Sequence, residues 1–108
     1  MIYYGMCYNL TFILGTFHSN IPKYYNLNAA HNWLPDLAAL EKQDLSKVKL
    51  MWISYPHMPT GAMADLSELK AIVDFAKRHN ILLVNDNPYS FVLCEHPLSL
   101  LSIAGAKE

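Results

Sequence analysis

Two short apolar runs, separated by one amphipathic segment, constrain the fold of this chain more than any other feature. The first run covers residues 48–53, and the second covers residues 81–84, where four apolar side chains follow one another (Ile-Leu-Leu-Val). Such runs are typical of parallel strands that are buried on both faces. With a helix between them they predict a strand–helix–strand unit, whose crossover is almost always right-handed.

Residues 65–79 carry the signals of the connecting helix. Asp65 and Glu68 have the spacing of a capping box, in which each side chain accepts a hydrogen bond from the backbone N–H of the other residue. Apolar residues recur along one helical face, at Leu66, Leu69, Ile72, Val73 and Ala76. We therefore expect one side of this helix to pack on the sheet.

The rest of the chain gives weaker signals. Residues 3–14 predict a helix, residues 21–25 a strand and residues 35–41 a short helix. Residues 90–94 are expected to be extended or irregular, and residues 97–103 to form another short helix. Together these elements indicate an α/β fold, with a partial, mostly parallel sheet and flanking helices.

The charge of the chain gives no reason to expect a nucleic-acid partner. The formal net charge of the 108 residues is −1, and Lys and Arg form no basic stripe. Residues 1–14 are uncharged and largely apolar, but a membrane span needs roughly 20 apolar residues. They also lack the basic start of a secretory signal. We expect neither a nucleic-acid nor a membrane partner.

The cysteine and histidine residues do not have the spacing of metal ligands. Cys7 and Cys94 lie in unrelated contexts and form no C-x-x-C pair, so we expect buried or free thiols in a reducing cytoplasm. His57 has no second His or Cys at metal spacing, which favours a structural role. The sequence therefore predicts no metal site and a cytoplasmic location.

Chemically useful residues follow both predicted strands, at residues 54–61 and 85–89. Open α/β sheets bind ligands at the carboxyl ends of their parallel strands. A partly buried carboxylate such as Asp86 needs a compensating cation or donor. The protonated ring nitrogen of pyridoxal phosphate is such a cation, and Tyr89 could return its hydroxyl to the phenolic oxygen of that cofactor. The alternative is that Asp86 caps a turn and Tyr89 packs.

Two sequence segments together resemble the class I and II aminotransferases, pyridoxal-phosphate enzymes of the aspartate-aminotransferase fold. They are residues 50–61 (LMWISYPHMPTG) and residues 81–89 (ILLVNDNPY). Those enzymes carry an N-P-x-N-P-T-G loop, then a helix, then a hydrophobic strand ending in D-x-x-Y. Residues 32–41 also resemble their G-W-x-P-D-x-x-x-L-E segment. The resemblance implies that residues 1–108 form one fragment of the large, three-layer αβα cofactor-binding domain, without the small domain.

The resemblance also implies roles for individual residues. Asp86 would pair with the pyridine nitrogen of the cofactor and Tyr89 with its phenolic oxygen. Tyr4 would correspond to the aromatic residue that stacks on the cofactor ring, and a packing role for Tyr4 remains the alternative. Met58 replaces a loop Asn of the family, and a thioether cannot donate the hydrogen bond that this Asn makes.

The function implied for the parent protein is amino transfer between an amino acid and a 2-oxo acid. The Schiff-base lysine of the family lies in an S-x-S-K-type motif downstream of D-x-x-Y, and this sequence contains no such motif. Lys107 lies in Gly-Ala-Lys-Glu and does not substitute for it. Because a nucleophilic amine is needed for this chemistry, we assign no catalytic residue and expect the chain alone to be inactive.

The main alternative is a non-catalytic remnant that self-associates. A piece of a domain exposes apolar surface and sheet edges, which promotes assembly into a homo-oligomer. An unrelated doubly wound binding module would need a phosphate loop or an acidic cluster, and the sequence has neither.

Overall fold

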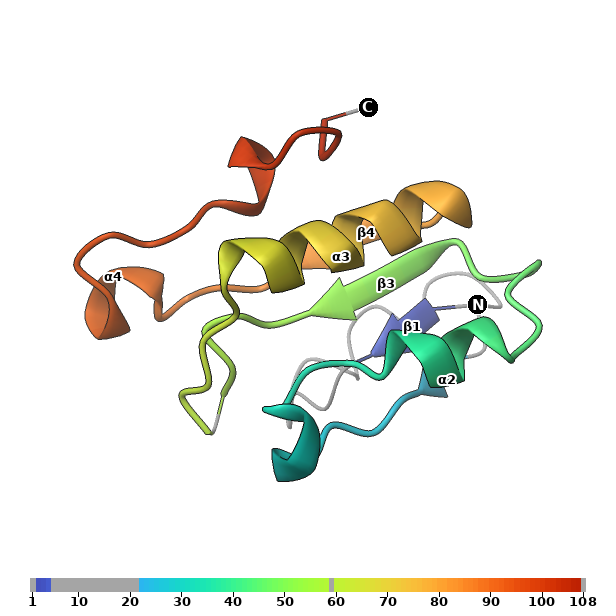
Figure 1. Ribbon diagram of the computed structural model, residues 1–108, viewed down its shortest axis with the longest axis horizontal. Coiled ribbons are helices and arrows are strands. Elements are labelled where there is room, and N and C mark those ends of the chain that lie inside the picture. The colour runs from blue at the N-terminus through green and yellow to red at the C-terminus, as the bar shows by residue number, and fades with distance from the viewer. Residues whose placement is uncertain (1, 5–21, 59, 108) are drawn as a thin grey trace.

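The computed structural model describes residues 2–4, 22–58 and 60–107 (Figure 1). Its four described strands form one sheet in the order β2-β1-β3-β4, and all neighbouring strands are parallel. The strands are β1 (Ile2–Tyr4), β2 (Pro22–Tyr24), β3 (Leu50–Ile53) and β4 (Leu82–Asn85). The parallel α/β architecture expected from the sequence is confirmed.

Helices α2 and α3 lie on the same face of the sheet (Figure 1). Right-handed crossovers require this arrangement, because the β2-to-β3 and β3-to-β4 connections move across the sheet in the same direction. The helical elements are η1 (Ala29–His31), α2 (Leu37–Glu41), α3 (Leu66–Arg78), α4 (Ser90–Leu93) and η2 (Leu100–Ser102), with η1 and η2 of the 3₁₀ type. None of the described helices is long and apolar enough to cross a membrane.

The core lies between the sheet and these two helices. Met51 and Ile53 of β3 are fully buried, whereas the alternate residues Leu50 and Trp52 are only half-buried. This alternation follows from the period of two in a strand, which directs neighbouring side chains to opposite faces. Phe75 of α3 and Leu40 of α2 complete the same buried cluster.

Helix α3 begins at the predicted capping box. The Asp65 carboxylate accepts a hydrogen bond from the Glu68 N–H at 2.8 Å, and the Glu68 carboxylate accepts one from the Asp65 N–H at 2.7 Å. The predicted apolar face is buried from Leu69 onward, but Leu66 in the first turn is exposed. At its other end, the Arg78 guanidinium lies 2.6 Å from the Glu41 carboxylate of α2.

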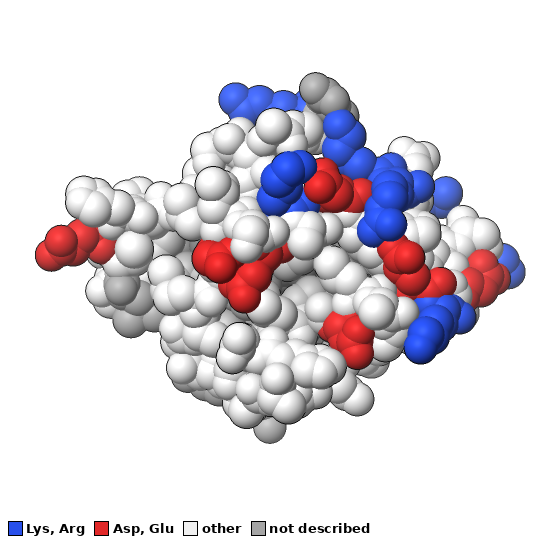
Figure 2. Space-filling model, in the orientation of Figure 1, with Lys and Arg blue, Asp and Glu red and all other residues white. Residues whose placement is uncertain are grey.

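The charged side chains are unevenly distributed over this face. Figure 2 shows the Lys and Arg side chains at the top and right of the view, with Asp and Glu side chains among them, whereas the left part carries Asp and Glu side chains alone. Lys70 and Asp74 form one pair of opposite charge within α3, with 2.9 Å between the ammonium nitrogen and a carboxylate oxygen. Charges of opposite sign therefore lie next to one another on one side of this face.

Strand β4 differs from the prediction. We expected burial on both faces, but Leu82 is 64% exposed and the next three residues are only half-buried. The reason is topological, because β4 is the last strand in the order of the described sheet and has a strand neighbour on one side. An apolar run alone does not reveal this edge position.

Three other predictions need correction. The helix predicted over residues 3–14 is wrong where the structure describes it, because residues 3 and 4 belong to β1, which pairs with both β2 and β3. The remaining residues, 5–14, lie outside the described part. Residues 90–94 were expected to be extended or irregular, but residues 90–93 form α4, since the Ser90 N–H and hydroxyl both donate to the Asn87 carbonyl and start a turn. The helix expected over residues 97–103 is reduced to η2.

The strand predicted at residues 21–25 is confirmed as β2, and the short helix predicted at residues 35–41 is confirmed as α2. Helix α2 starts two residues later than expected. Asp36 is its N-cap, and the carboxylate accepts a hydrogen bond from the Ala39 N–H at 2.9 Å.

Candidate functional site

The carboxyl ends of β3 and β4 lie side by side. Ile53 pairs with Asn85, and the Asp86 N–H continues the ladder by donating to the Ile53 carbonyl at 2.9 Å. The loops that follow the two strands therefore leave the same edge of the sheet (Figure 1). This confirms the geometry on which the sequence interpretation depends.

The side chain of Asn85 joins these two loops. Its carbonyl oxygen accepts a hydrogen bond from the Tyr55 N–H at 3.0 Å, and its NH₂ group donates to the Tyr55 carbonyl at 3.3 Å. Sequence reasoning missed this residue. The available signal was an amide side chain at the end of an apolar strand, directly before the candidate acid Asp86.

A third segment meets the same edge through Tyr55. Its hydroxyl donates a hydrogen bond to the Trp33 carbonyl at 2.7 Å, and Tyr55 as a whole is 5% exposed. Burial raises the pKa of the Tyr55 hydroxyl far above its usual range, and the negative charge of Glu68 adds to that shift. The hydroxyl therefore remains a hydrogen-bond donor at neutral pH.

His57 closes the loop that follows β3. Its Nδ1 lies 2.7 Å from the Thr60 hydroxyl oxygen, and its carbonyl accepts a hydrogen bond from the Gly61 N–H at 2.7 Å. Gly61 has φ 71°, a left-handed conformation that glycine adopts readily. The His57 ring also stacks on Trp33 with 6.1 Å between centroids. These contacts agree with the structural role expected for His57.

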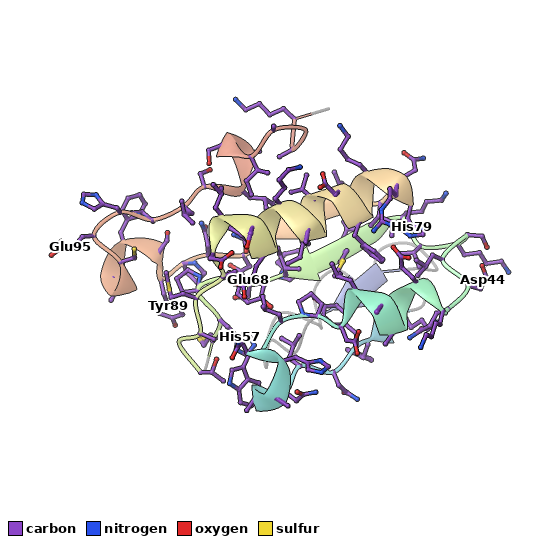
Figure 3. All side chains as sticks on the ribbon, in the orientation of Figure 1. Asp44, His57, Glu68, His79, Tyr89 and Glu95 are labelled. Carbon is purple, nitrogen blue, oxygen red and sulfur yellow. The ribbon has the colours of Figure 1, made fainter. Side chains whose placement is uncertain are left out.

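The backbone brings the three predicted cofactor residues to this edge. Asp86 directly follows β4 and is half-buried, and Tyr89, 38% exposed, is the N-cap residue of α4. Figure 3 shows Tyr89 and His57 at the same end of the molecule, in the segments after β4 and β3. Tyr4 is the last residue of β1 and is in register with Trp52 of β3. Their roles toward a cofactor remain predictions.

A small cavity lies beside the candidate site. Its volume is about 110 Å³, and Tyr55, Pro56, Ser90 and Cys94 are among its lining residues, whereas Asp86 and Tyr89 are not. Cys94 is a half-buried free thiol, as expected, and Cys7 lies outside the described residues. Among residues 2–4, 22–58 and 60–107, no group of three or more His, Cys, Asp or Glu side chains is arranged to hold a metal.

These features define a class of protein. Residues 17–105 match the family described as Aminotransferase class I and II, which covers most of the chain. The chain belongs to the class I and II aminotransferases. The resemblance seen in the two loop motifs is thereby confirmed, and the fold is that of an αβα aminotransferase.

Two relatives within this family show how similar the chain is to complete enzymes. The chain is 44% identical, over 87 residues, to an LL-diaminopimelate aminotransferase from Dehalococcoides mccartyi, covering 79% of this chain and 22% of that enzyme. It is 37% identical over 94 residues to the enzyme of the same name from Aquifex aeolicus, covering 85% of this chain and 24% of the relative. The chain thus spans less than a quarter of the length of these relatives.

A solved structure shows the same architecture. A probable N-succinyldiaminopimelate aminotransferase from Thermus thermophilus superposes with a TM-score of 0.81 and 28% sequence identity. The match covers 98% of this chain and 28% of that structure. The arrangement of strands and helices described above is therefore similar to one portion of a solved aminotransferase.

Proposed function

We propose that this chain supplies part of the cofactor-binding large domain of a longer, pyridoxal-phosphate-dependent aminotransferase, whose small domain lies outside residues 1–108. The observation that carries the proposal is the common edge of β3 and β4, where the 54–61 loop and the segment from Asp86 to Tyr89 leave side by side. The family match and the short span along each relative support it.

The side chains at this edge fit pyridoxal phosphate in their chemistry. When bound, this cofactor supplies an electron sink that depends on a protonated ring nitrogen paired with an acid. The half-buried Asp86 carboxylate is suited to hold that proton on the ring nitrogen. The Tyr89 phenol can donate a hydrogen bond to the phenolic oxygen, and Tyr4 is assigned to stack on the ring.

The cavity of about 110 Å³ beside the candidate site is lined by neither Asp86 nor Tyr89, and it is smaller than typical ligand pockets, which have volumes of roughly 300–1,000 Å³. We therefore propose that other segments of the longer protein close the site and supply the Schiff-base lysine, because the sequence contains no S-x-S-K motif. The chain alone would then bind the cofactor weakly and would not transaminate.

The proposed reaction exchanges an amino group between an amino acid and a 2-oxo acid in the cytoplasm. The relatives named LL-diaminopimelate aminotransferase make LL-diaminopimelate the first amino donor to test. It carries amino groups next to carboxylates, as the reaction requires.

A hybrid enzyme tests this proposal. Residues 17–105 of this chain would replace the matching segment of the Dehalococcoides mccartyi enzyme. We expect the hybrid to retain pyridoxal phosphate and to transfer amino groups from LL-diaminopimelate. Asp86→Ala should abolish cofactor retention and amino transfer. Asp44 is an exposed acid in the connection between α2 and β3, so Asp44→Ala should abolish neither property. A folded Asp86→Ala hybrid with full cofactor content and activity would contradict the proposal.

Self-association is the second candidate function. Helix α4 exposes Phe91 and Val92 by 87% and 75%, and the edge strand β4 exposes Leu82. These residues favour a non-catalytic homo-oligomer in which apolar surface is buried between copies. Sedimentation velocity of the 108-residue chain and of its Phe91→Ser variant tests this alternative. A concentrated sample that remains monomeric would count against it.

A further inference from the structure

The β3–β4 ladder continues beyond its last backbone pair through one side chain. Strand β3 ends at Ile53, and the chain bends at Tyr55 and Pro56. The Tyr55 N–H and carbonyl therefore lie beyond the last residue of the strand. The Asn85 amide bonds both of them, at 3.0 Å to the N–H and at 3.3 Å to the carbonyl. A side-chain amide has a donor and an acceptor in one plane, so it reproduces the pairing of a backbone peptide group.

These two hydrogen bonds lie in a buried part of the molecule. Tyr55 is 5% exposed and Asn85 is half-buried. A buried N–H or carbonyl without a partner is unfavourable, so removing the amide would release this stretch of the loop. The Tyr55 hydroxyl already holds the Trp33 carbonyl at 2.7 Å. The Asn85 side chain therefore links β4 to two preceding segments.

Asn85 directly precedes Asp86, so the clamp lies next to the candidate acid. The Asp86 N–H donates to the Ile53 carbonyl at 2.9 Å, and the Asn85 side chain bonds Tyr55, two residues beyond Ile53. Asn85 is in register with the buried Ile53, and in-register residues of parallel strands lie on the same face of a sheet. The Asn85 side chain thus faces the helices.

We infer that Asn85 is a positioning residue of the cofactor site. Its side-chain amide fixes the 54–61 loop against the segment that carries Asp86, and it does so without touching the cofactor. This inference rests on the proposed function for its meaning. The clamp between Asn85 and Tyr55 is nevertheless measurable in the 108-residue chain without any ligand.

Hydrogen–deuterium exchange in the 108-residue chain tests the clamp. Asn85→Leu removes both hydrogen bonds, and Asn85→Asp keeps the acceptor for the Tyr55 N–H but loses the donor. We expect the Tyr55 amide to exchange about tenfold faster in Asn85→Leu, as for the loss of one buried hydrogen bond, and less than that in Asn85→Asp. The Asp86 amide should follow it.

Two control variants separate the clamp from charge and from general stability. Asn87→Asp adds the same charge on the other side of Asp86 and should leave the Tyr55 amide unchanged. Leu40→Ala weakens the core and should speed exchange of the core amides of α3 as much as that of Tyr55. Equal rates at Tyr55 in the wild type and in both Asn85 variants would overturn the inference.

The hybrid enzyme described above tests the positioning role, because it supplies the segments that the 108-residue chain lacks. We expect the wild-type hybrid to retain pyridoxal phosphate, and the folded Asn85→Leu hybrid to bind it more weakly and with a changed cofactor absorption spectrum. Unchanged affinity and spectrum in that variant would overturn the positioning role. If the wild-type hybrid retains no pyridoxal phosphate, the proposed cofactor function fails, and with it the positioning role, whereas the exchange result for the clamp stands independently.

Discussion

The Tyr55 hydroxyl donates a hydrogen bond to the Trp33 carbonyl at 2.7 Å, which joins the loop after β3 to the segment before α2. The two residues are 22 positions apart in the sequence. The Asn85 side chain also bonds the backbone N–H and carbonyl of Tyr55. Tyr55 therefore holds three segments together at the carboxyl edge of the sheet, one through its hydroxyl and one through its backbone.

Tyr55→Phe should lower the free energy of unfolding by about 1–2 kcal/mol, because it removes this hydrogen bond and leaves the Trp33 carbonyl without its donor. Urea denaturation at neutral pH measures the change. Tyr89→Phe is a suitable control, since the Tyr89 side chain is at the surface and its hydroxyl should contribute much less to stability. Equal effects of the two changes would contradict the assigned role of Tyr55.

The stability of the protein should also fall at alkaline pH, because the buried Tyr55 hydroxyl then loses its proton. Burial, followed by the charge of Glu68, raises the pKa of Tyr55 in the folded state above its usual value of 10.0. The unfolded chain therefore loses this proton first, so the stabilisation is complete below about pH 10 and is lost as the pH rises above it. Tyr55→Phe should become relatively more stable against the wild type over that range. Parallel stability curves for the two proteins would be inconsistent with this shift.

The capping box of α3 should make stability depend on pH in the opposite direction, with a loss in acid. Hydrogen bonds from the Ser67 hydroxyl and the Glu68 N–H lower the pKa of Asp65 below 3.8. Its contribution is present above that pH and is lost as the pH falls through the lowered pKa. Asp65→Ala should reduce the melting temperature at neutral pH, and the difference from the wild type should shrink in acid.

Asp65→Asn provides the matched control for that experiment. Asparagine keeps an N-cap acceptor but does not titrate, so it should lose less at neutral pH than Asp65→Ala does. A melting-temperature difference between Asp65→Ala and the wild type that stays constant from neutral pH to strong acid would show that the carboxylate does not act through its charge.

Substitution of Gly61 should lower the free energy of unfolding through the backbone conformation alone. It has φ 71°, and an added Cβ would have no atom within 4 Å. Gly61→Ala should cost about 1 kcal/mol in the free energy of unfolding, whereas Gly61→Asn should cost less, since Asn tolerates the left-handed region. Chemical denaturation of the two variants distinguishes them. A larger loss for Asn than for Ala would indicate that space around the side chain, not φ, is limiting.

The strand–helix–strand unit could be predicted from the sequence because its signals are local. Asp65 and Glu68 identify the start of α3, and the apolar runs identify β3 and β4. Strand β1 could not be found in this way, since a short apolar run gives no period that separates a strand from a helix. Its strand state depends on pairing with β2 and β3, which are distant in the sequence.

The candidate site was predictable only in part. Asp86 and Tyr89 follow a recognisable strand, so their place at the edge could be predicted, and their roles remain to be tested. Asn85 was missed because its partner Tyr55 is 30 residues away, and no local pattern marks such a contact. The exposure of Leu82 was missed because it depends on which strands lie next to β4.

The strand order affects how the chain can fold during translation. Strand β1 leaves the ribosome before the other described strands, yet it belongs between β2 and β3, and its register with β3 joins Ile2 to Leu50. The nascent chain must therefore keep this early strand competent for insertion while roughly half of the 108 residues are still being translated.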